Sequence, residues 1–339
     1  MFVKKFLPLF VCLLLWSCAF VPPGEKSDEV TITILQMNDV YEIDPVNGGK
    51  EGGLARVASL RDMLLRNNPN MLTVLAGDLF SPSALGTAPY QDGRLNGKQI
   101  VDAMNALGLD YITFGNHEFD LKKGPFYERL KESGFTWISS NCFTEKGTAF
   151  PGVVEDKIID IKGVKVGIFG ITLPQNQVDY VRYRDPFVAA EQKVAELRPK
   201  VDILIALTHL AKEDDIQLAD RFPEIDLILG GHEHENMQLW RGKAFTPIFK
   251  ADANARTVYI HNLCYKSGAA KKLSQKLSIT SKLYRITDAL PEQAKTAAVV
   301  RKWREIGYAG FAEDGLHPER VVATTDVELD GLEVNVRNS

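Results

Sequence analysis

The stretch Tyr111-Ile112-Thr113-Phe114-Gly115-Asn116-His117-Glu118 contains the pattern on which the predicted fold depends. Its first four residues form a short apolar run of the kind found in buried strands. The residues after the run offer an amide, an imidazole and a carboxylate, and a glycine separates the two parts. The pattern therefore predicts a buried strand that delivers polar, ligand-type side chains at its carboxyl end.

The same pattern occurs four more times along the chain, each time with polar residues directly after an apolar run. These are Asn38-Asp39 after 31–36, Gly77-Asp78 after 71–75, Thr208-His209 after 203–207, and Gly230-Gly231-His232-Glu233-His234 after 227–229. Taken singly, an aspartate after a strand is usually a helix cap or turn former, and a lone histidine is usually structural. Taken together, the five clusters should converge on one sheet edge, where open α/β sheets bind ligands. Their carboxylate, amide and imidazole groups suit zinc, manganese or iron better than calcium.

Helical periodicity between the apolar runs predicts the fold class. Apolar residues recur at helical spacing in 53–66, 96–107, 186–197 and 211–222, and 164–169 is a further strand candidate. This alternation predicts an α/β fold with largely parallel strands. After Met237 the pattern changes to the strand-like runs 258–263 and 273–279, which predict a second sheet edge or an antiparallel closure. A helix over 291–306 and a lone strand over 325–336 follow.

Several common catalytic motifs are absent from the sequence. His232-Glu233-His234 is not an HExxH zinc motif, because Asn236 stands where the second histidine is needed. The segment 93–98 has too few residues for a P-loop. No nucleophile elbow and no dinucleotide-binding glycine fingerprint occurs. The formal net charge of −4 offers no basic footprint, so we expect no nucleic-acid partner.

The first residues have the pattern of a leader peptide. Lys4 and Lys5 precede the apolar run 6–16, which is too short to span a bilayer. The run ends in Leu15-Trp16-Ser17-Cys18, which resembles a bacterial lipobox with Cys18 as the acylated residue. We therefore expect a signal peptide over 1–18 and a tether over 19–29, with membrane contact only through a lipid anchor. Because Trp16 is unusual in such a box, simple secretion is the alternative.

Cysteine usage excludes a zinc knuckle and a thioredoxin-type site, because the sequence has no CxxC pair. Cys12 lies in the leader with Cys18. The mature chain then keeps Cys142 and Cys264. We expect two buried free thiols, with a single disulfide as the alternative.

At family level, the ordered blocks resemble the calcineurin-like metallophosphoesterases. The strings 52–56, 76–78, 114–120 and 206–210 resemble the bacterial 5'-nucleotidase branch, which includes UDP-sugar hydrolases and cyclic-nucleotide phosphodiesterases. The resemblance covers roughly residues 30–280. It implies a four-layer α/β/β/α sandwich with a catalytic domain over 30–285. It also implies an enzyme that hydrolyses small-molecule phosphate esters, namely nucleoside 5'-phosphates or related nucleotides. With the leader peptide, we expect an exported protein of the periplasm or cell envelope, and we expect it to be a monomer.

The resemblance further implies a site with two divalent metal ions, of manganese, zinc, cobalt or iron. Asp78 would bridge the two ions. Asp39 and His234 would hold the first ion. His117 would contact the phosphoryl group or the leaving oxygen, and Asp120 would orient it. The implied ligands of the second ion are Asn116, His209 and His232.

The sequence departs from the family pattern in its first block. The family has Asp-x-His, whereas this chain has Asp39-Val40-Tyr41. Tyr41 could ligate the first metal as a phenolate, although its reference pKa near 10 disfavours that form unless the metal is strongly acidic. Otherwise Tyr41 packs elsewhere, or Glu42 supplies an oxygen.

The second departure concerns the C-terminal region. We expect residues 286–339 to form a linker helix and the shortened start of a C-terminal 5'-nucleotidase domain, because 325–337 resembles the opening of that domain. The tail after Pro291 either docks on the expected catalytic domain or extends away from it. Nucleoside specificity cannot be assumed without that domain. The alternative functions are a phosphodiesterase, a broad phosphatase, or a degenerate non-catalytic surface lipoprotein.

Overall fold

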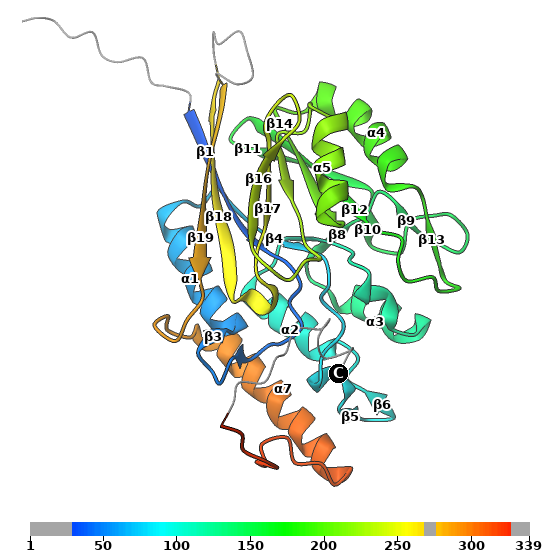
Figure 1. Cartoon of the computed structure of the whole chain (residues 1–339), viewed down its shortest axis with the longest axis vertical. Coiled ribbons are helices and arrows are strands. Elements are labelled where there is room, and N and C mark those ends of the chain that lie inside the picture. Colours follow the sequence, from blue (N-terminus) through cyan, green and yellow to red (C-terminus); the bar gives the residue numbers. More distant parts are fainter. Residues whose placement is uncertain (1–28, 268–275, 327–339) are drawn as a thin grey trace, which may run out of the picture.

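The computed structural model describes residues 29–267 and 276–326 and consists of four layers (Figure 1). Two β-sheets pack face to face, and helices cover the outer face of each sheet. The predicted α/β/β/α sandwich is therefore confirmed. The leader with Cys18, and the predicted 325–336 strand from residue 327 onward, lie outside the described residues.

The first sheet has seven strands, of which five are parallel. In order across the sheet they are β10 (Val153–Val154), β8 (Thr136–Ile138), β7 (Tyr111–Thr113), β4 (Met71–Ala76), β1 (Glu29–Met37), β18 (Thr257–Lys266) and β19 (Leu277–Arg285). The last two strands are antiparallel to their neighbours. This confirms the antiparallel closure predicted for the chain after Met237.

The second sheet has six strands with a parallel centre. Its order is β11 (Asp156–Ile161), β12 (Val164–Thr172), β14 (Ile203–His209), β15 (Leu227–Leu229), β17 (Thr246–Lys250) and β16 (Met237–Arg241). The two edge strands run antiparallel to their neighbours. The strands that carry the five polar clusters are thus divided between two sheets. The expectation of a single sheet edge, drawn from the strand pattern alone, is wrong.

The helices pack on the two outer faces, and each layer boundary has its own apolar core. On the first sheet lie α1 (Leu54–Asn67), α2 (Lys98–Leu107), α3 (Lys123–Glu132) and α7 (Ala294–Glu313), and on the second lie α4 (Pro186–Leu197) and α5 (Lys212–Arg221). Helix α7 packs against the helices of the first sheet: the indole of Trp303 lies in the first core and donates to Asp102 of α2 at 2.7 Å.

Short elements complete the described chain. Three two-stranded ribbons pair β2 (Pro45–Val46) with β3 (Glu51–Gly52), β5 (Pro89–Tyr90) with β6 (Gly93–Arg94), and β9 (Cys142–Thr144) with β13 (Val181–Tyr183). Single 3-10 turns occur at Leu85–Thr87, His117–Asp120, Arg198–Lys200 and Ala253–Ala255. No described helix has the length and apolarity that a membrane crossing requires.

The two cysteines in the described part of the chain, Cys142 and Cys264, are both free thiols, as predicted. Cys142 is buried at the start of β9, which also agrees with the expectation. Cys264, however, is half-buried, because it lies on the face of β18 next to Glu29 at the end of the sheet. The expectation that it would be buried was wrong.

A buried polar group links the two sheets directly behind the strand ends. Gln36 of β1 donates through Nε2 to the carbonyls of Gly230 and Phe249, at 3.1 and 2.9 Å. Its Oε1 must then accept, so the partner His261 carries its proton on Nε2, 2.9 Å away. The other ring nitrogen of His261 accepts from the Ser281 hydroxyl at 2.7 Å. The link fixes the position of β1 against the loop that follows β15.

This link predicts a pH dependence of stability. Burial lowers the pKa of His261 to about 3, whereas an unfolded histidine titrates near 6.5. Below pH 6.5, His261 binds a proton in the unfolded state but stays neutral in the folded state. The free energy of unfolding should therefore fall by up to about 1.4 kcal/mol per pH unit from this group. Urea unfolding of the wild type and His261→Gln between pH 7 and 5 measures it, and equal slopes in the two proteins would refute it.

Candidate metal centre

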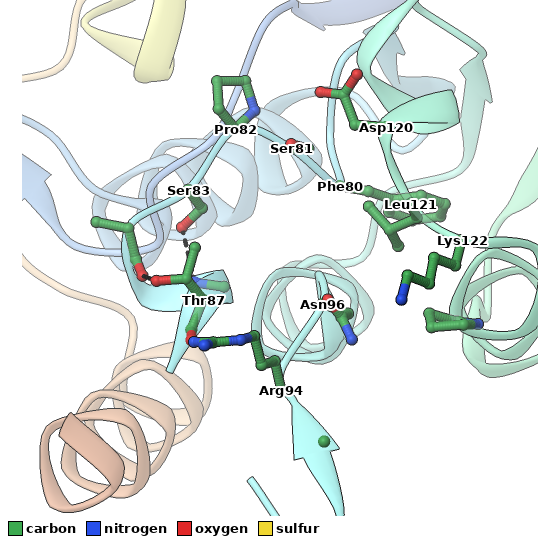
Figure 2. Close-up of a pocket in the computed structure, with 14 residues that line it drawn as sticks. Phe80, Ser81, Pro82, Ser83, Thr87, Arg94, Asn96, Asp120, Leu121 and Lys122 are labelled. Atoms are coloured by element: carbon green, nitrogen blue, oxygen red, sulfur yellow. Dashed lines mark hydrogen bonds between the residues drawn. The ribbon is translucent and has the colours of Figure 1, made fainter. Parts of the chain in front are cut away.

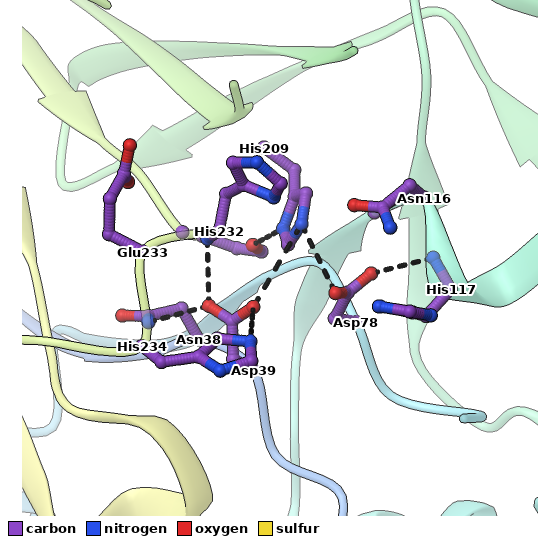
Figure 3. Close-up of polar contacts among 12 residues, drawn as sticks. Asn38, Asp39, Asp78, Asn116, His117, His209, His232, Glu233 and His234 are labelled. Carbon is purple, nitrogen blue, oxygen red and sulfur yellow. Dashed lines mark hydrogen bonds and ion pairs between the residues drawn. The ribbon is translucent and has the colours of Figure 1, made fainter. Parts of the chain in front are cut away.

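All six predicted metal ligands meet where strands of the two sheets end (Figure 3). Asp39, Asp78 and Asn116 follow β1, β4 and β7 of the first sheet. The remaining ligands come from the second sheet: His209 is the last residue of β14, and His232 and His234 follow β15. Ligand atoms of Asp39, Asp78 and His209 lie within 4.8 Å of one another, and all three residues are buried. The convergence inferred from the sequence is thus present, at an edge that both sheets form.

Both carboxylates use one oxygen for anchoring and present the other to the centre. Oδ2 of Asp39 accepts from the backbone N–H of His232 at 2.9 Å and from Asn38 at 2.8 Å. Oδ1 of Asp78 accepts from the backbone N–H of His117 at 2.9 Å. The other oxygens, Asp39 Oδ1 and Asp78 Oδ2, accept from the Tyr41 hydroxyl and lie 3.9 and 3.3 Å from Nε2 of His209. Both oxygens therefore face the centre, where they could bind a cation.

Two buried atoms at the centre have no hydrogen-bond partner among the described residues: Nε2 of His209 and Oδ1 of Asn116. His209 points its Nδ1 at the Ala76 carbonyl, 2.8 Å away, which leaves Nε2 facing the carboxylates. Burial opposes protonation of His209, yet Asp78 and Asp39 raise its pKa to about 10. The two carboxylates thus favour a positive charge at this centre. A divalent cation would supply that charge and would give both Nε2 of His209 and Oδ1 of Asn116 a partner. The residues present fit a metal centre.

Four of the candidate ligands have backbone angles that non-glycine residues seldom adopt. The φ angles of Asp39, Asp78, His232 and His234 are 52°, 60°, 90° and 60°. Such conformations cost on the order of 1–3 kcal/mol each and cluster at functional sites. The hydrogen bonds to Asp39 and Asp78 hold this backbone in place. The strained backbone angles turn these four side chains toward the candidate metal centre.

Two glycines in the motifs permit the close approach that the sequence pattern predicted. A Cβ on Gly115 would lie 2.0 Å from Asp78 Oδ1, and one on Gly231 would lie 2.3 Å from the Ala76 carbonyl. The same Cβ on Gly115 would lie 2.6 Å from the backbone nitrogen of Asp78, so any larger residue at either glycine would displace the ligand-bearing backbone.

Tyr41 lies inside the centre. Its hydroxyl is 2.9 Å from Asp78 Oδ2, 3.2 Å from Asp39 Oδ1 and 2.9 Å from His234 Nε2. Burial, followed by Asp78 and Asp39, raises the pKa of this phenol far above its usual range. The alternative that Tyr41 packs elsewhere is therefore wrong. The carboxyl of Glu42 interacts with Ser83 and Ala84 instead of the centre. Metal ligation by Tyr41 stays a prediction.

A histidine in place of Tyr41 should change the metal preference of the first site. The substitution Tyr41→His supplies a neutral imidazole among Asp39, Asp78 and His234, and we expect affinity there to rise by roughly tenfold or more. Metal content after dialysis against mixed manganese, zinc, cobalt and iron measures the change. Tyr41→Phe, which removes only the hydroxyl, is the matched control. A metal profile that both substitutions leave unaltered would place Tyr41 outside the coordination shell.

His117 and Asp120 form the predicted pair beside the metal ligands. His117 Nδ1 lies 2.7 Å from Asp120 Oδ2, and the other oxygen of Asp120 accepts from Asn176 at 2.6 Å. Asn176 also donates to the Asn116 carbonyl at 2.9 Å, which ties the pair to the metal-ligand loop. Asp120, more than any other neighbour, raises the pKa of His117. The ring therefore keeps Nε2 free, and Asp120 favours its protonated form.

Sequence reasoning assigned no role to Glu118, which anchors the ligand loops from within. The side chain is fully buried and accepts from the backbone N–H groups of four residues, Asp78, Leu79, Phe80 and Gly115. It thereby locks the loop after β4 against the loop after β7. The only signal in the sequence was its place in the Gly-Asn-His-Glu string.

A buried lysine behind the histidines was also missed. Lys250, at the end of β17, is 0% exposed and lies 2.8 Å from Asp215 and 2.5 Å from Glu233. It also donates to the carbonyls of Leu210 and Gly231, at 2.7 and 2.8 Å. Those carbonyls directly flank His209 and His232 in sequence. Asp215 in turn accepts from the Thr208 hydroxyl at 2.7 Å. This buried lysine cluster, Lys250 with Asp215 and Glu233, fixes the segments that carry three candidate ligands.

Comparison with known proteins agrees with this geometry. Residues 32–236 match the family model of the calcineurin-like phosphoesterases. Snake venom 5'-nucleotidase from Gloydius brevicauda is 31% identical over 237 residues, which are 64% of this chain and 39% of the relative. The 5'-nucleotidase of Vibrio cholerae is 26% identical over 260 residues, or 69% of this chain and 46% of the relative. The chain thus spans less than half the length of these relatives.

Solved structures share the fold. The 5'-nucleotidase precursor from Thermus thermophilus superposes with a TM-score of 0.68 at 23% identity, covering 81% of this chain and 59% of that one. The calcineurin-like phosphoesterase YfkN from Bacillus subtilis superposes with a TM-score of 0.66 at 20% identity, covering 82% and 97%. At such identities the likeness concerns the fold alone. The family match over residues 32–236 identifies the chain as a member of the calcineurin-like phosphoesterase family.

Proposed function

We propose that this protein hydrolyses phosphate esters with two divalent cations, and that nucleoside 5'-phosphates or related nucleotides are its substrates. One observation carries the proposal: Asp39, Asp78 and His209 converge around a buried, unpartnered imidazole nitrogen, with the His117–Asp120 pair beside them. The 5'-nucleotidases among the relatives support the nucleotide substrate class.

The ligands divide into two sets that share Asp78. Asp39 and His234 would hold one cation, with Asp78 between the two ions. The second set is Asn116, His209 and His232. When bound, two cations offset the charge of the phosphate ester and lower the pKa of a water molecule that attacks phosphorus.

The His117–Asp120 pair supplies the proton chemistry. Asp120 holds Nδ1 of His117, so Nε2 is the atom that faces the leaving oxygen. A proton on Nε2 stabilises the negative charge that develops on that oxygen as the ester bond breaks. Asn176 and the backbone of Asn116 keep the pair in line with the metal ligands.

A second candidate function follows from Tyr41. Because its hydroxyl lies among Asp39, Asp78 and His234, a neutral phenol would weaken the first cation site. The protein would then be a surface protein that binds phosphate esters without turnover. The intact His117–Asp120 pair favours the enzyme over this alternative.

Phosphate release by the purified chain tests the proposal. The protein is loaded in turn with manganese, zinc, cobalt and iron. It is then offered a nucleoside monophosphate, a cyclic nucleotide, a UDP-sugar and an aryl phosphate. Release from nucleotides supports a nucleotidase, and release from the aryl ester alone indicates a broad phosphatase. If the protein binds metal but releases no phosphate with any of the four metals, the non-catalytic alternative is supported.

We also propose that the enzyme acts outside the cytoplasm. The basis is the sequence pattern at 4–18, with Cys18 as lipid acceptor. Radiolabelled palmitate should enter the wild-type protein in a bacterial host and be lost in Cys18→Ser. Label that persists in Cys18→Ser would rule out this residue as the acceptor.

A further inference from the structure

An open pocket of about 770 Å³ lies beside the catalytic pair (Figure 2). Its walls come from the loop after β4 (80–87), the segment 93–96 and the segment 120–125. Asp120 belongs both to this wall and to the pair with His117. Because His117 faces the leaving oxygen, whatever is attached to that oxygen can extend into this space.

The pocket carries two cations that no acidic side chain neutralises. Within the described chain, the ammonium of Lys122 makes neither an ion pair nor a hydrogen bond, and Figure 2 shows this side chain directed toward Asn96 across the pocket. The guanidinium of Arg94 donates to the Thr87 carbonyl and to no other described residue. Among the lining residues the single acid is Asp120, whose two oxygens are occupied by His117 and Asn176. The lining thus holds two basic side chains and one acid, whereas the whole chain has a net charge of −4.

Neutral donors supplement the two cations. The side chains of Asn96 and Ser81 line the pocket, and neither makes a hydrogen bond with another described residue. A few unpaired polar groups that converge on a concave surface are typical of a ligand site. Phe80 is the one aromatic residue in the lining and is only 1% exposed, so the pocket has no surface on which a nucleobase could stack.

We propose that this pocket binds a second anionic group, carried by the leaving portion of the substrate. Lys122 and Arg94 supply charge-assisted hydrogen bonds to its oxygens, and Asn96 and Ser81 complete the set. The preferred substrates are then phosphate esters or anhydrides with two phosphates, such as a sugar bisphosphate or a nucleoside diphosphate. This inference rests on the proposed function, since it assigns the leaving-group side of the same reaction.

Four substrates distinguish the effect of a second anionic group on kcat/KM from the effect of a nucleobase. An aryl phosphate has neither, a nucleoside monophosphate has the base, a sugar bisphosphate has the anion, and a nucleoside diphosphate has both. The kcat/KM of each is measured for the manganese-loaded wild type, for Lys122→Met and for Arg94→Gln. The matched control is Lys123→Met, because Lys123 is the adjacent lysine, is exposed, pairs with Glu145 and lies outside the pocket.

For Lys122→Met we expect kcat/KM of the two substrates with a second anion to fall about tenfold relative to the two without it. Arg94→Gln should act in the same direction, and Lys123→Met should cause no selective loss. High salt should shrink the selective loss, because the charges are solvent-accessible. An equal effect of Lys122→Met on all four substrates, or an equal selective loss in Lys123→Met, would overturn the inference. If no phosphate is released from any substrate, the proposed function itself fails.

Discussion

Replacing His117 with alanine should lower kcat by about 10²- to 10⁴-fold while the metal content stays at the wild-type level. In the proposed mechanism the imidazole stabilises the leaving oxygen, and Asp120 acts on that position through His117. The link from His117 to Asp78 runs through the backbone N–H of His117, which donates to Asp78 Oδ1, and alanine keeps that group. Steady-state phosphate release and elemental analysis on the same preparation measure the two quantities.

Asp120→Asn is the companion variant for this experiment. It keeps the shape of the side chain and removes the charge that favours protonated His117. We expect a smaller loss of kcat than in His117→Ala, with unchanged metal content. If His117→Ala loses its metals together with its activity, His117 is a metal ligand and the assigned role is wrong.

Replacing Lys250 with methionine should lower the free energy of unfolding by about 3–5 kcal/mol. The substitution leaves Asp215, which is fully buried, without the cation that lies 2.8 Å away. It also frees the carbonyls of Leu210 and Gly231, so the histidine segments should lose their fixed positions. Metal affinity should fall by about 10- to 100-fold in the protein that still folds. Urea unfolding and metal titration measure the two effects.

Two further variants serve as the control and the rescue for Lys250→Met. Lys123→Met removes a lysine from a pair with side chains 52% and 36% exposed, and should change stability by less than about 1 kcal/mol. Adding Asp215→Asn to Lys250→Met removes the stranded charge and should recover part of the lost stability. If Lys250→Met were no more destabilising than Lys123→Met, the buried lysine cluster would not hold the histidine segments.

The parts of the fold predicted correctly are those with strong local signals. The runs at 71–75, 203–207 and 227–229 are short, apolar and followed by polar residues, and each became a buried strand. The candidate ligands could be found because strand ends carry them. Only the resemblance indicated that the strands belong to two sheets, because periodicity does not report which strands pair.

Other features depend on tertiary contacts that the local pattern does not encode. Helix α3 was missed because Gly124 and Pro125 open it and its mean hydropathy is low. Lys250 ends the apolar strand β17, at a position where a lysine is usually solvent-exposed. Its burial here depends on Asp215 and Glu233 from two other segments. Glu118 turns back onto backbone groups that lie about forty residues upstream in the chain. The strained angles at His232 and His234 likewise become visible only in three dimensions.

Titration of metal into the stripped enzyme, with phosphate release and bound metal followed together, tests the central claim most directly. Two cations should bind per chain, activity should be absent in the stripped protein, and it should appear only as both sites fill. In Asp78→Asn, which weakens the residue shared by the two sites, binding and activity should fall together. Phosphate release that persists without metal, or two bound cations with no release from any phosphate ester, would contradict the account.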